Sequence, residues 1–428
     1  MNRTDEKYQL YVQILKEELV PALGCTEPIA IAYVSAKARE VLGAFPDRIV
    51  VECSGNIVKN VKGVIVPGTG NLRGIEASAI IGAVAGDASR KLEVLTGIRE
   101  ADVQKTKELI AQGICEARLL ENGANLHVIV TASSGEHSAL VELRDSHTNI
   151  VRIEKDGEII YTCHEGRENP DEAASDRTAL NIADIYDFAN TVQIADIKDL
   201  LDHQIEDNMR IAEEGLNKPY GASVGATLLE CYGDDIKTVA KAYPAAGSDA
   251  RMSGCELPVV INSGSGNQGM TVSLPVIKYA QHLKKDKETL YRALALSNLV
   301  AIHQKTGIGR LSAYCGAVSA ACGSGAAITY LYGGSLEMIN KTITNTLANV
   351  SGIVCDGAKP SCAAKIASAV DAALMGHYMA MHNQVFHPGE GIVKENVEET
   401  IQSVGKLGRE GMKQTDQEIL HIMIDSAQ

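Results

Sequence analysis

Cysteine is the residue type whose number and spacing in this chain point most directly to chemistry. The 428 residues include ten cysteines, and Cys315, Cys322, Cys355 and Cys362 form two C-x6-C pairs that lie close together in the sequence. Thiolates gathered in this way bind zinc or an iron–sulfur cluster, although structural zinc sites favour C-x2-4-C spacing. The alternative is that several of these cysteines are small buried hydrophobic residues, and the spacing leaves both interpretations open.

The elements that must position these cysteines differ between the two pairs. The first pair falls in a predicted helix over 311–331, with its members about 10.5 Å apart along the axis, so one compact cluster takes only one of them. Between Cys355 and Cys362, glycines and a proline predict an irregular loop that can fold around a metal centre. Cys362 then opens a predicted helix over 362–380, whose positive end stabilises a thiolate and an anionic cluster.

A further cysteine, Cys25, stands just before a predicted helix over Thr26–Leu42. Thr26 is the expected N-cap, Pro28 lies in the first turn, and Gly43 ends the helix. A thiol at a helix N-terminus has a lowered pKa, so Cys25 could serve as a base or a nucleophile. A cysteine that only packs at the start of the helix is the more common outcome.

A glycine-rich stretch from Gly264 to Gly269 matches G-x-G-x-x-G and follows strand-like residues over Leu257–Ile261. We reject dinucleotide binding for this stretch because Pro275 falls where the phosphate-binding helix should be in its second turn. What remains is a loop of backbone N–H groups with Ser, Asn and Gln side chains, which suits a carboxylate. A tight turn with buried backbone is the alternative.

The basic residues and histidines give weaker indications of a functional site than the cysteines do. Lys305 and Arg310 are the cations nearest the cysteine-rich helix, and a solvated turn is favoured over carboxylate binding for both. His377, His382 and His387 are spaced by five residues, which does not place them on one helical face, so ordinary surface or core roles are expected.

Composition excludes several classes of function. The formal net charge of −14 disfavours nucleic acids and anionic membranes as partners, and a chain with 3 Phe and no Trp has few rings for stacking on bases. Two uncharged stretches, Leu257–Ile277 and Leu311–Leu336, contain too many polar or small residues for membrane helices. The polar start predicts a cytoplasmic protein, in which the cysteines are not disulfides.

The order of patterns along the chain predicts an α+β fold. Strand-like runs at Arg48–Cys53 and Val64–Val66 precede an antiparallel meander between Leu126 and Thr162, and Glu165–Asp176 is the expected linker. Helical patterns then dominate, at 177–190, 194–215, 222–232, 286–304, 311–331, 335–349, 362–380 and 394–411. The expected domains are an α+β domain over 1–165, a helical connection over 166–215 and a mostly helical catalytic domain over 216–428.

At the residues discussed above, nearly the whole chain resembles the serine dehydratase alpha-chain-like family, and within it the branch that contains L-cysteine desulfidase. The resemblance is carried by Leu23-Gly24-Cys25-Thr26-Glu27-Pro28, Gly55 to Asn60, Ile65 to Thr69, Ser263 to Gly269, Ser312 to Gly316 and Gly352 to Cys362. The Gly-Cys-Thr-Glu-Pro motif differs from the Ser-rich, His-containing motif of true serine dehydratases. This difference argues against serine as the principal substrate.

The resemblance implies a [4Fe-4S] cluster held by Cys315, Cys355 and Cys362, with Cys25 as the proton acceptor. A small amino-acid substrate is then expected to bind through its carboxylate at the glycine-rich loop, and the expected contacts are Thr26, Asn60, Ser263, Gly264, Ser265, Gly266, Asn267 and Gln268. The remaining cysteines are predicted to be packing thiols, namely Cys53, Cys115, Cys163, Cys231, Cys255 and Cys322.

The reaction implied by this resemblance is β-elimination from L-cysteine to give pyruvate, ammonia and sulfide, without pyridoxal phosphate. L-Serine dehydration is the first alternative. A non-catalytic metal or thiol sensor is the second, and it predicts that Cys25 is buried and far from the other three cysteines. The sequence leaves open whether the protein forms a homo-oligomer.

Overall fold

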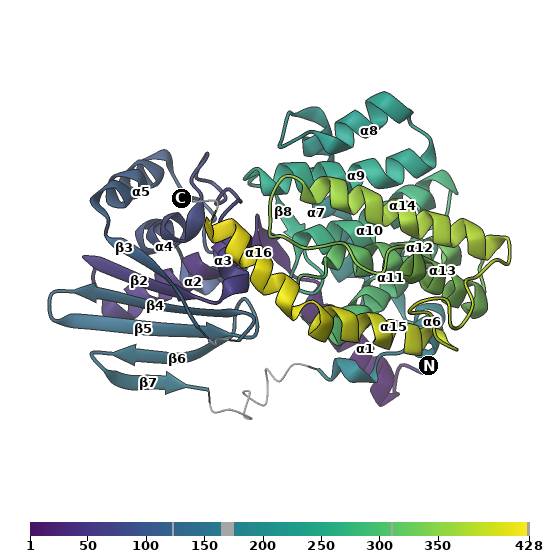
Figure 1. Ribbon diagram of the computed structural model, residues 1–428, viewed down its shortest axis with the longest axis horizontal. Helices are drawn as coiled ribbons and strands as arrows, with labels where there is room; N and C mark the ends of the chain where they lie inside the picture. The colour runs from purple at the N-terminus through teal and green to yellow at the C-terminus, as the bar shows by residue number, and fades with distance from the viewer. Residues whose placement is uncertain (122–123, 164–174, 310, 426–428) are drawn as a thin grey trace.

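The computed structural model describes residues 1–121, 124–163, 175–309 and 311–425. Strands gather at one end of the molecule and helices fill the other (Figure 1), so the predicted α+β fold is confirmed. Most of the expected linker Glu165–Asp176 lies outside the described residues, and so does Arg310. The predicted division into 1–165, 166–215 and 216–428 stays a prediction.

Within the described residues, the larger sheet has the strand order β3-β2-β4-β5-β6-β7. Its strands are β2 Arg48–Cys53, β3 Cys115–Leu119, β4 His127–Ser134, β5 His137–Arg144, β6 Ile150–Lys155 and β7 Glu158–Thr162. The strands from β4 to β7 form the predicted antiparallel meander, whereas β2 and β3 pair in parallel. The expected strand at Val64–Val66 forms only an isolated bridge between Ile65 and Arg73.

The parallel pair is connected through α3 Gly55–Val61, α4 Gly74–Ala85 and α5 Glu100–Gln112. Of these, α4 packs on β2 and β3, and α5 packs on α4. Helix α2 Thr26–Leu42 has the predicted bounds and ends at Gly43 with φ of 81°, and it packs against β4, β5 and α4. A side chain at Gly82 would place its Cβ 2.3 Å from the carbonyl oxygen of Ala32. The two helices therefore meet backbone to backbone at a position that only glycine fits.

The N-cap of α2 corrects one expectation. Cys25 holds the N-cap position, with extended backbone, and Thr26 is the first helical residue. The Cys25 side chain makes no capping hydrogen bond to the backbone of the first turn, because it is used by another group in the site described below.

The carboxy-terminal part is a bundle of buried and surface helices. They are α6 Ile182–Thr191, α7 Lys198–Asn217, α8 Val224–Tyr232, α9 Ile236–Met252, α10 Gly266–His282, α11 Lys287–Ile308, α12 Gly316–Leu331, α13 Leu336–Asn349, α14 Cys362–Met381 and α15 Val397–Lys406. The bundle also contains the short helical segments η2 Arg177–Ala179, η3 Ile194–Asp196 and η4 Leu407–Gly411, and a further one, η1 Ala88–Glu93, lies between α4 and α5 in the amino-terminal part. The predicted helix over 311–331 begins only at Gly316, so Cys315 precedes it.

Helix α10 overturns the argument made from Pro275, because the helix starts at Gly266 and runs through this proline to His282. Tertiary packing offsets the local cost of the proline, because the helix is buried over most of its length. The Ser297 hydroxyl on α11 also donates to the Val272 carbonyl oxygen (2.7 Å). The preceding strand β8 Pro258–Val260 pairs antiparallel with β1 Pro21–Leu23. That pairing is not the parallel unit that a dinucleotide-binding fold requires.

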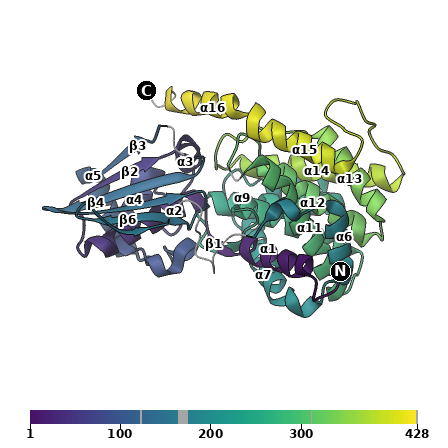
Figure 2. The same cartoon turned by 90° about the horizontal axis from the view of Figure 1, so that it is seen from below.

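The amino-terminal and carboxy-terminal helices each connect the part that contains the larger sheet with the helical part. Helix α1 Glu6–Glu18 packs on the helical part, where the rings of Tyr8 and Tyr11 lie 5.4 and 5.5 Å from the ring of Phe188. Helix α16 Lys413–Asp425 extends in the opposite direction and contacts α3 (Figures 1 and 2). Both termini therefore tie the sheet part to the bundle.

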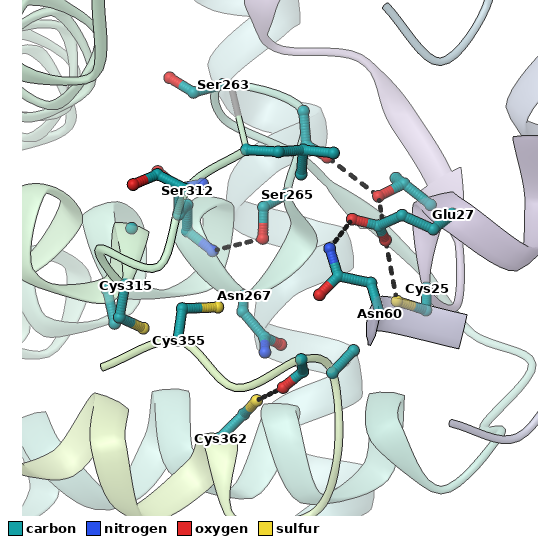
Figure 3. A pocket seen from close by; sticks show the side chains of 18 of the residues that line it. Cys25, Glu27, Asn60, Ser263, Ser265, Asn267, Ser312, Cys315, Cys355 and Cys362 are labelled. Carbon is teal, nitrogen blue, oxygen red and sulfur yellow. Dashed lines mark hydrogen bonds between the residues drawn. The ribbon is translucent and has the colours of Figure 1, made fainter. Parts of the chain in front are cut away.

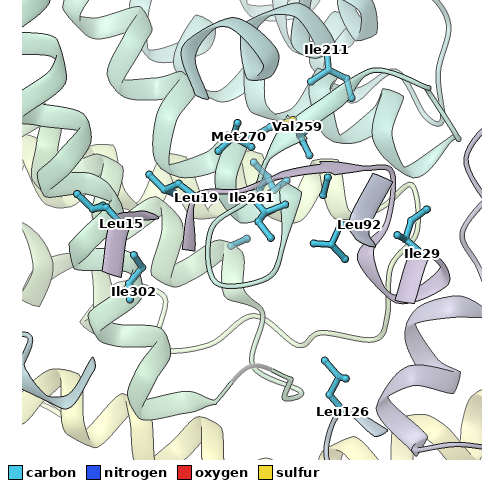
Figure 4. Packing of buried hydrophobic residues seen from close by; sticks show 14 of the residues in the cluster. Leu15, Leu19, Ile29, Leu92, Leu126, Ile211, Val259, Ile261, Met270 and Ile302 are labelled. Atoms are coloured by element: carbon cyan, nitrogen blue, oxygen red, sulfur yellow. The ribbon is translucent and has the colours of Figure 1, made fainter. Parts of the chain in front are cut away.

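The largest cluster of buried side chains is continuous between the two parts. Figure 4 shows members of this cluster from both parts: Leu15, Val259 and Met270 on the helical side, Ile29 of α2, and Leu126, which directly precedes β4. This continuity gives a rigid frame for groups placed at the junction. No helix in the described part of the chain has both the length and the apolar character needed to cross a membrane.

Candidate active site

A pocket at the junction of the two parts collects nearly all of the residues that the sequence singled out (Figure 3). Its lining includes Cys25, Thr26, Asn60, Ser263, Gly264, Ser265, Asn267, Gln268, Cys315, Cys355 and Cys362. Gly266 does not line the pocket, because it lies against the guanidinium of Arg251. A Cβ at this glycine would come within 2.5 Å of Arg251 Nε.

The amino-terminal ends of α2, α10, α12 and α14 meet at this pocket. Cys25, Ser265 and Cys315 hold the N-cap positions of α2, α10 and α12, and Cys362 is the first residue of α14. Each helix N-terminus carries partial positive charge and N–H groups without intrahelical partners. The pocket therefore favours anionic ligands and thiolates.

A short antiparallel bridge brings two of the cysteines together. Tyr314 pairs with Val354, so the Cys315 N–H donates to the Ile353 carbonyl (2.9 Å) and the Cys355 N–H donates to the Ala313 carbonyl (2.7 Å). The irregular loop predicted after Cys355 is confirmed, and it ends where α14 begins at Cys362.

The thiols of this group are not equivalent. A hydrogen bond from Cys315 lowers the pKa of Cys355 to about 5, against the effect of burial and with help from the positive charges of Lys59 and Lys305. The same hydrogen bond, together with burial, raises the pKa of Cys315, and burial raises that of Cys362. The two thiols are therefore coupled, and the nearby cations favour loss of one proton from the pair.

The two lysines near these thiols are themselves buried. Lys59 on α3 is 2% exposed and forms an ion pair with Asp416 of α16, so the carboxy-terminal helix completes the surroundings of Cys355. Lys305 lies on α11 at 5% exposure and lines the pocket. The expectation of a solvated turn at Lys305 is therefore wrong.

The opposite side of the pocket is built around a buried carboxylate. Glu27 Oε2 accepts hydrogen bonds from Cys25 Sγ (3.1 Å) and Thr26 Oγ1 (3.1 Å), and Oε1 accepts from Asn60 Nδ2 (3.0 Å). His147, from the turn between β5 and β6, places Nε2 3.9 Å from Oε1. Figure 3 shows the chain of contacts from Asn60 through Glu27 to Cys25.

These contacts determine the protonation of Cys25 and Glu27. Burial raises the pKa of the Cys25 thiol well above its usual value, and the Glu27 charge adds to this effect against that of Arg251. Burial alone would raise the pKa of Glu27, but its contacts with His147 and Cys25 and the charge of Arg251 lower it to about 2. The lowered pKa expected for Cys25 at a helix N-terminus is therefore wrong, since desolvation and a nearby carboxylate outweigh the helix dipole.

Several buried polar atoms that face the pocket have no hydrogen-bond partner within the described residues. They are His147 Nε2, Arg251 Nε, Gln268 Oε1 and Tyr314 Oη. Buried polar groups are nearly always paired. A cluster of unpaired groups around one cavity indicates that the cavity takes a polar ligand.

Comparison with known proteins assigns the family. Residues 89–421 match the family described as serine dehydratase alpha chain. The chain belongs to this family. Similar proteins are named UPF0597 protein: one of Lachnoclostridium phytofermentans is 59% identical over 98% of this chain and 100% of its own length. Others of Desulfitobacterium hafniense and Treponema denticola are 53% and 50% identical, over 99% of this chain and 99% and 100% of theirs.

Membership of the serine dehydratase alpha chain family indicates an amino-acid dehydratase-like role, and hence lyase activity in general. The name of the UPF0597 relatives states no substrate. The pocket suits a small amino acid, because it offers N–H groups and a guanidinium for a carboxylate beside thiol and carboxylate groups.

The donor set fits the metal group expected for this family. Among the described residues, no three His, Cys, Asp or Glu side chains are arranged to hold a single metal ion. An iron–sulfur cluster is larger than one ion, and each cysteine binds a different iron. Cys315, Cys355 and Cys362 line one cavity from separate segments, so the residues present are of the type that binds an iron–sulfur cluster.

Sequence reasoning missed three residues of this site: Glu27, His147 and Arg251. Glu27 stands two residues after Cys25, so its proximity could have been noticed. His147 had the signature of a polar hairpin turn, and Arg251 lies in α9, a helix that the sequence patterns did not predict.

The remaining cysteines divide by burial. Cys322 is buried inside α12, with its Sγ 3.9 Å from the Ile343 carbonyl oxygen, as a packing thiol should be. Cys53 and Cys255 are buried too, and Cys115 and Cys163 are half-buried. Cys231 is exposed on α8, so its predicted packing role is wrong.

Proposed function

We propose that this protein is a lyase that eliminates the β-substituent of a small L-amino acid, with L-cysteine as the preferred substrate. The observation that carries the proposal is the composition of the pocket. Three thiols from separate segments line one side, and Cys25 with its carboxylate partner Glu27 lines the other. The products from L-cysteine and water are pyruvate, ammonia and hydrogen sulfide.

Cys315, Cys355 and Cys362 would hold a [4Fe-4S] cluster in this proposal. Such a cluster, with three protein ligands, supplies an iron that acts as a Lewis acid towards the leaving group of the substrate. The protein contributes the thiolate at Cys355, the cations Lys59 and Lys305, and the positive ends of α12 and α14. These groups favour the charged form of the ligands.

Arg251 and the loop at 263–268 would bind the α-carboxylate of the substrate. The guanidinium is 2% exposed, and its Nη1 donates to Asn267 Oδ1 (3.2 Å). Its Nε has no hydrogen-bond partner among the described residues. A buried cation with an unpaired donor is costly, and the carboxylate of a substrate would offset that cost with a bidentate contact.

Cys25 would accept the proton that leaves the substrate Cα. Its Sγ lies in the same pocket as the three ligand thiols and is held by the hydrogen bond to Glu27. Loss of the α-proton and of the β-substituent gives aminoacrylate, which tautomerises and hydrolyses to pyruvate and ammonia. The base and the group that polarises the leaving substituent must both contact the substrate in one bound orientation. The proposed reaction needs no pyridoxal phosphate.

The experiment is pyruvate release under anaerobic conditions from L-cysteine, L-serine, L-threonine and their D-isomers, with iron and acid-labile sulfide measured on the same sample. We expect bound iron and sulfide, and the highest kcat/KM with L-cysteine. Preference for L-serine would favour the second candidate, an L-serine ammonia-lyase, which the description of the family supports. Pyruvate from none of the substrates with an iron-loaded protein would refute the lyase proposal.

A non-catalytic thiol or metal sensor has one feature in its favour, which is the burial of Cys25 at 2% exposure. The same cysteine nevertheless lines the pocket that contains Cys315, Cys355 and Cys362, whereas a sensor with an unrelated Cys25 predicts that these groups lie far apart. The pocket therefore favours the lyase.

A further inference from the structure

The state of Cys25 raises a question that the proposed elimination must answer. The thiol is buried, and it donates a hydrogen bond to Glu27 while its proton stays on the sulfur. A thiol that keeps its proton cannot accept the α-proton of a substrate. The proton on Cys25 therefore needs an acceptor, and the structure offers one path for it.

That path starts at the two oxygens of Glu27. Oε2 accepts the hydrogen bond from Cys25, while Oε1 faces His147 Nε2 at 3.9 Å. In the resting state Asn60 Nδ2 donates to Oε1 and orients the carboxylate. The Thr26 hydroxyl lies 3.1 Å from Oε2 and shares its one proton with the Gly264 carbonyl oxygen. The Nε2–Oε1 distance is about 1 Å longer than a hydrogen bond, a gap that a small side-chain rotation closes.

The position of His147 is unusual for a residue of a hairpin turn. It belongs to the turn between β5 and β6, yet it is 5% exposed, lines the pocket, and has an Nε2 without a hydrogen-bond partner within the described residues. Burying an unpaired imidazole nitrogen costs free energy. Histidine is also the side chain best suited to gain and lose a proton near neutral pH.

We propose, on the basis of the proposed elimination, that Glu27 and His147 form a proton relay that converts Cys25 into the thiolate. The proton on Cys25 Sγ passes to Glu27 Oε2, and rotation of the carboxyl group then carries this same proton to His147 Nε2, which accepts it. The net result is a thiolate at Cys25, a carboxylate at Glu27 and an imidazolium at His147, with no electron transferred. Glu27 and His147 are positioning residues, since both act through Cys25.

The relay explains why the sheet part reaches the pocket. The His127–Glu142 pair, on β4 and β5, shows an ordinary structural pairing within the sheet, with Nε2 2.9 Å from Oε1. His147 instead crosses to a carboxylate on α2, a separate element. Both pairs join a histidine to a glutamate at low exposure, so His127 provides a matched control.

The test measures the reactivity of Cys25 directly, in the full-length protein with its iron. Methyl methanethiosulfonate is added near neutral pH, and mass spectrometry follows the peptide that contains Cys25 in wild type, H147Q and H127Q. We expect H147Q to slow modification of Cys25 about tenfold or more and to lower kcat similarly. This loss is smaller than the about 10²–10⁴-fold contributed by an acid–base group itself, because His147 acts through Cys25. KM and the visible absorbance of the cluster should stay near wild type, and H127Q should match wild type throughout.

Modification of Cys25 at the wild-type rate in H147Q would overturn the relay. If H147Q does not reach the circular dichroism spectrum of wild type, H147N takes its place in the same comparison. The reactivity of Cys25 does not depend on turnover, so the two proposals can fail separately. Slowed modification in a protein that releases no pyruvate would keep the relay and reject the lyase.

Discussion

The two sides of the pocket place the same residue type in opposite electrostatic surroundings. On one side, Cys355 accepts a hydrogen bond from Cys315 and has Lys59 and Lys305 as cationic neighbours, and its pKa falls to about 5. On the other side, Cys25 donates to the carboxylate of Glu27, and its pKa rises with burial. Desolvation raises the pKa of both thiols, so it does not by itself decide their protonation.

This contrast teaches what each side can do. A cysteine among cations and helix N-termini is a thiolate, and a thiolate is the form that binds metal. A cysteine beside a carboxylate keeps its proton in the resting state and is suited to proton transfer. The predictions below test this division of roles, starting with the change of largest effect.

Replacing a thiol on the cationic side should remove the metal group altogether. We expect C355S to lose most of the bound iron and sulfide, and pyruvate release to fall to background, because a serine hydroxyl does not replace the thiolate ligand. Iron content, sulfide content and turnover check this result. C231S, which removes the exposed thiol of α8, should match wild type. Full iron content in C355S would contradict the assignment of Cys355 as a ligand of the metal group.

Replacing the thiol on the carboxylate side should leave the metal group in place. C25S is expected to keep the iron content and visible absorbance of wild type while kcat falls about 10²–10⁴-fold, the range of general acid–base catalysis. Pyruvate release and spectra on the same sample check this. Turnover within about tenfold of wild type would remove Cys25 from the proton-transfer step.

The charge of Glu27 should appear in the pH dependence of stability. Its pKa is about 2 in the folded protein and about 4.3 when unfolded, so the ionised carboxylate stabilises the fold fully above the unfolded value. That stabilisation, about 3 kcal/mol, is lost as the pH falls towards 2. Urea unfolding across this range should show a steeper acid loss of stability in wild type than in E27Q. Parallel curves would contradict the assigned charge.

The smallest effect is expected from the cation on the Cys25 side. R251K keeps the charge but loses the planar fork that grips a carboxylate, so we expect KM to rise about tenfold, with a smaller change in kcat. Steady-state kinetics with L-cysteine checks this. If kcat fell while KM stayed constant, Arg251 would act on the chemistry of Cys25 rather than on substrate binding.

Much of the local structure could be predicted from the sequence. The bounds of α2 and β2 agree with the predictions to the residue, because each element is delimited by strong local signals such as Gly43. The meander from β4 to β7 is also confirmed. These elements depend on near neighbours in the chain, which a sequence displays directly.

Prediction failed where distant contacts outweigh local preference. Helix α10 passes through Pro275 because packing against the surrounding helices offsets the local cost of the proline. Strand β3 joins β2 in parallel through a long connection, and no local pattern announces such a pairing. The burial of Lys305 also depends on its position on α11 within the folded bundle.

The sequence by itself determined which cysteines could matter and which local elements would carry them, because those signals lie within short stretches around Cys25, Cys315, Cys355 and Cys362. Only the tertiary structure decided that these stretches share one pocket and that Glu27, His147 and Arg251 belong to it. It also decided the protonation of each thiol. The physical reason is that a pKa depends on desolvation and on charges a few ångströms away, and folding brings those charges from distant parts of the chain.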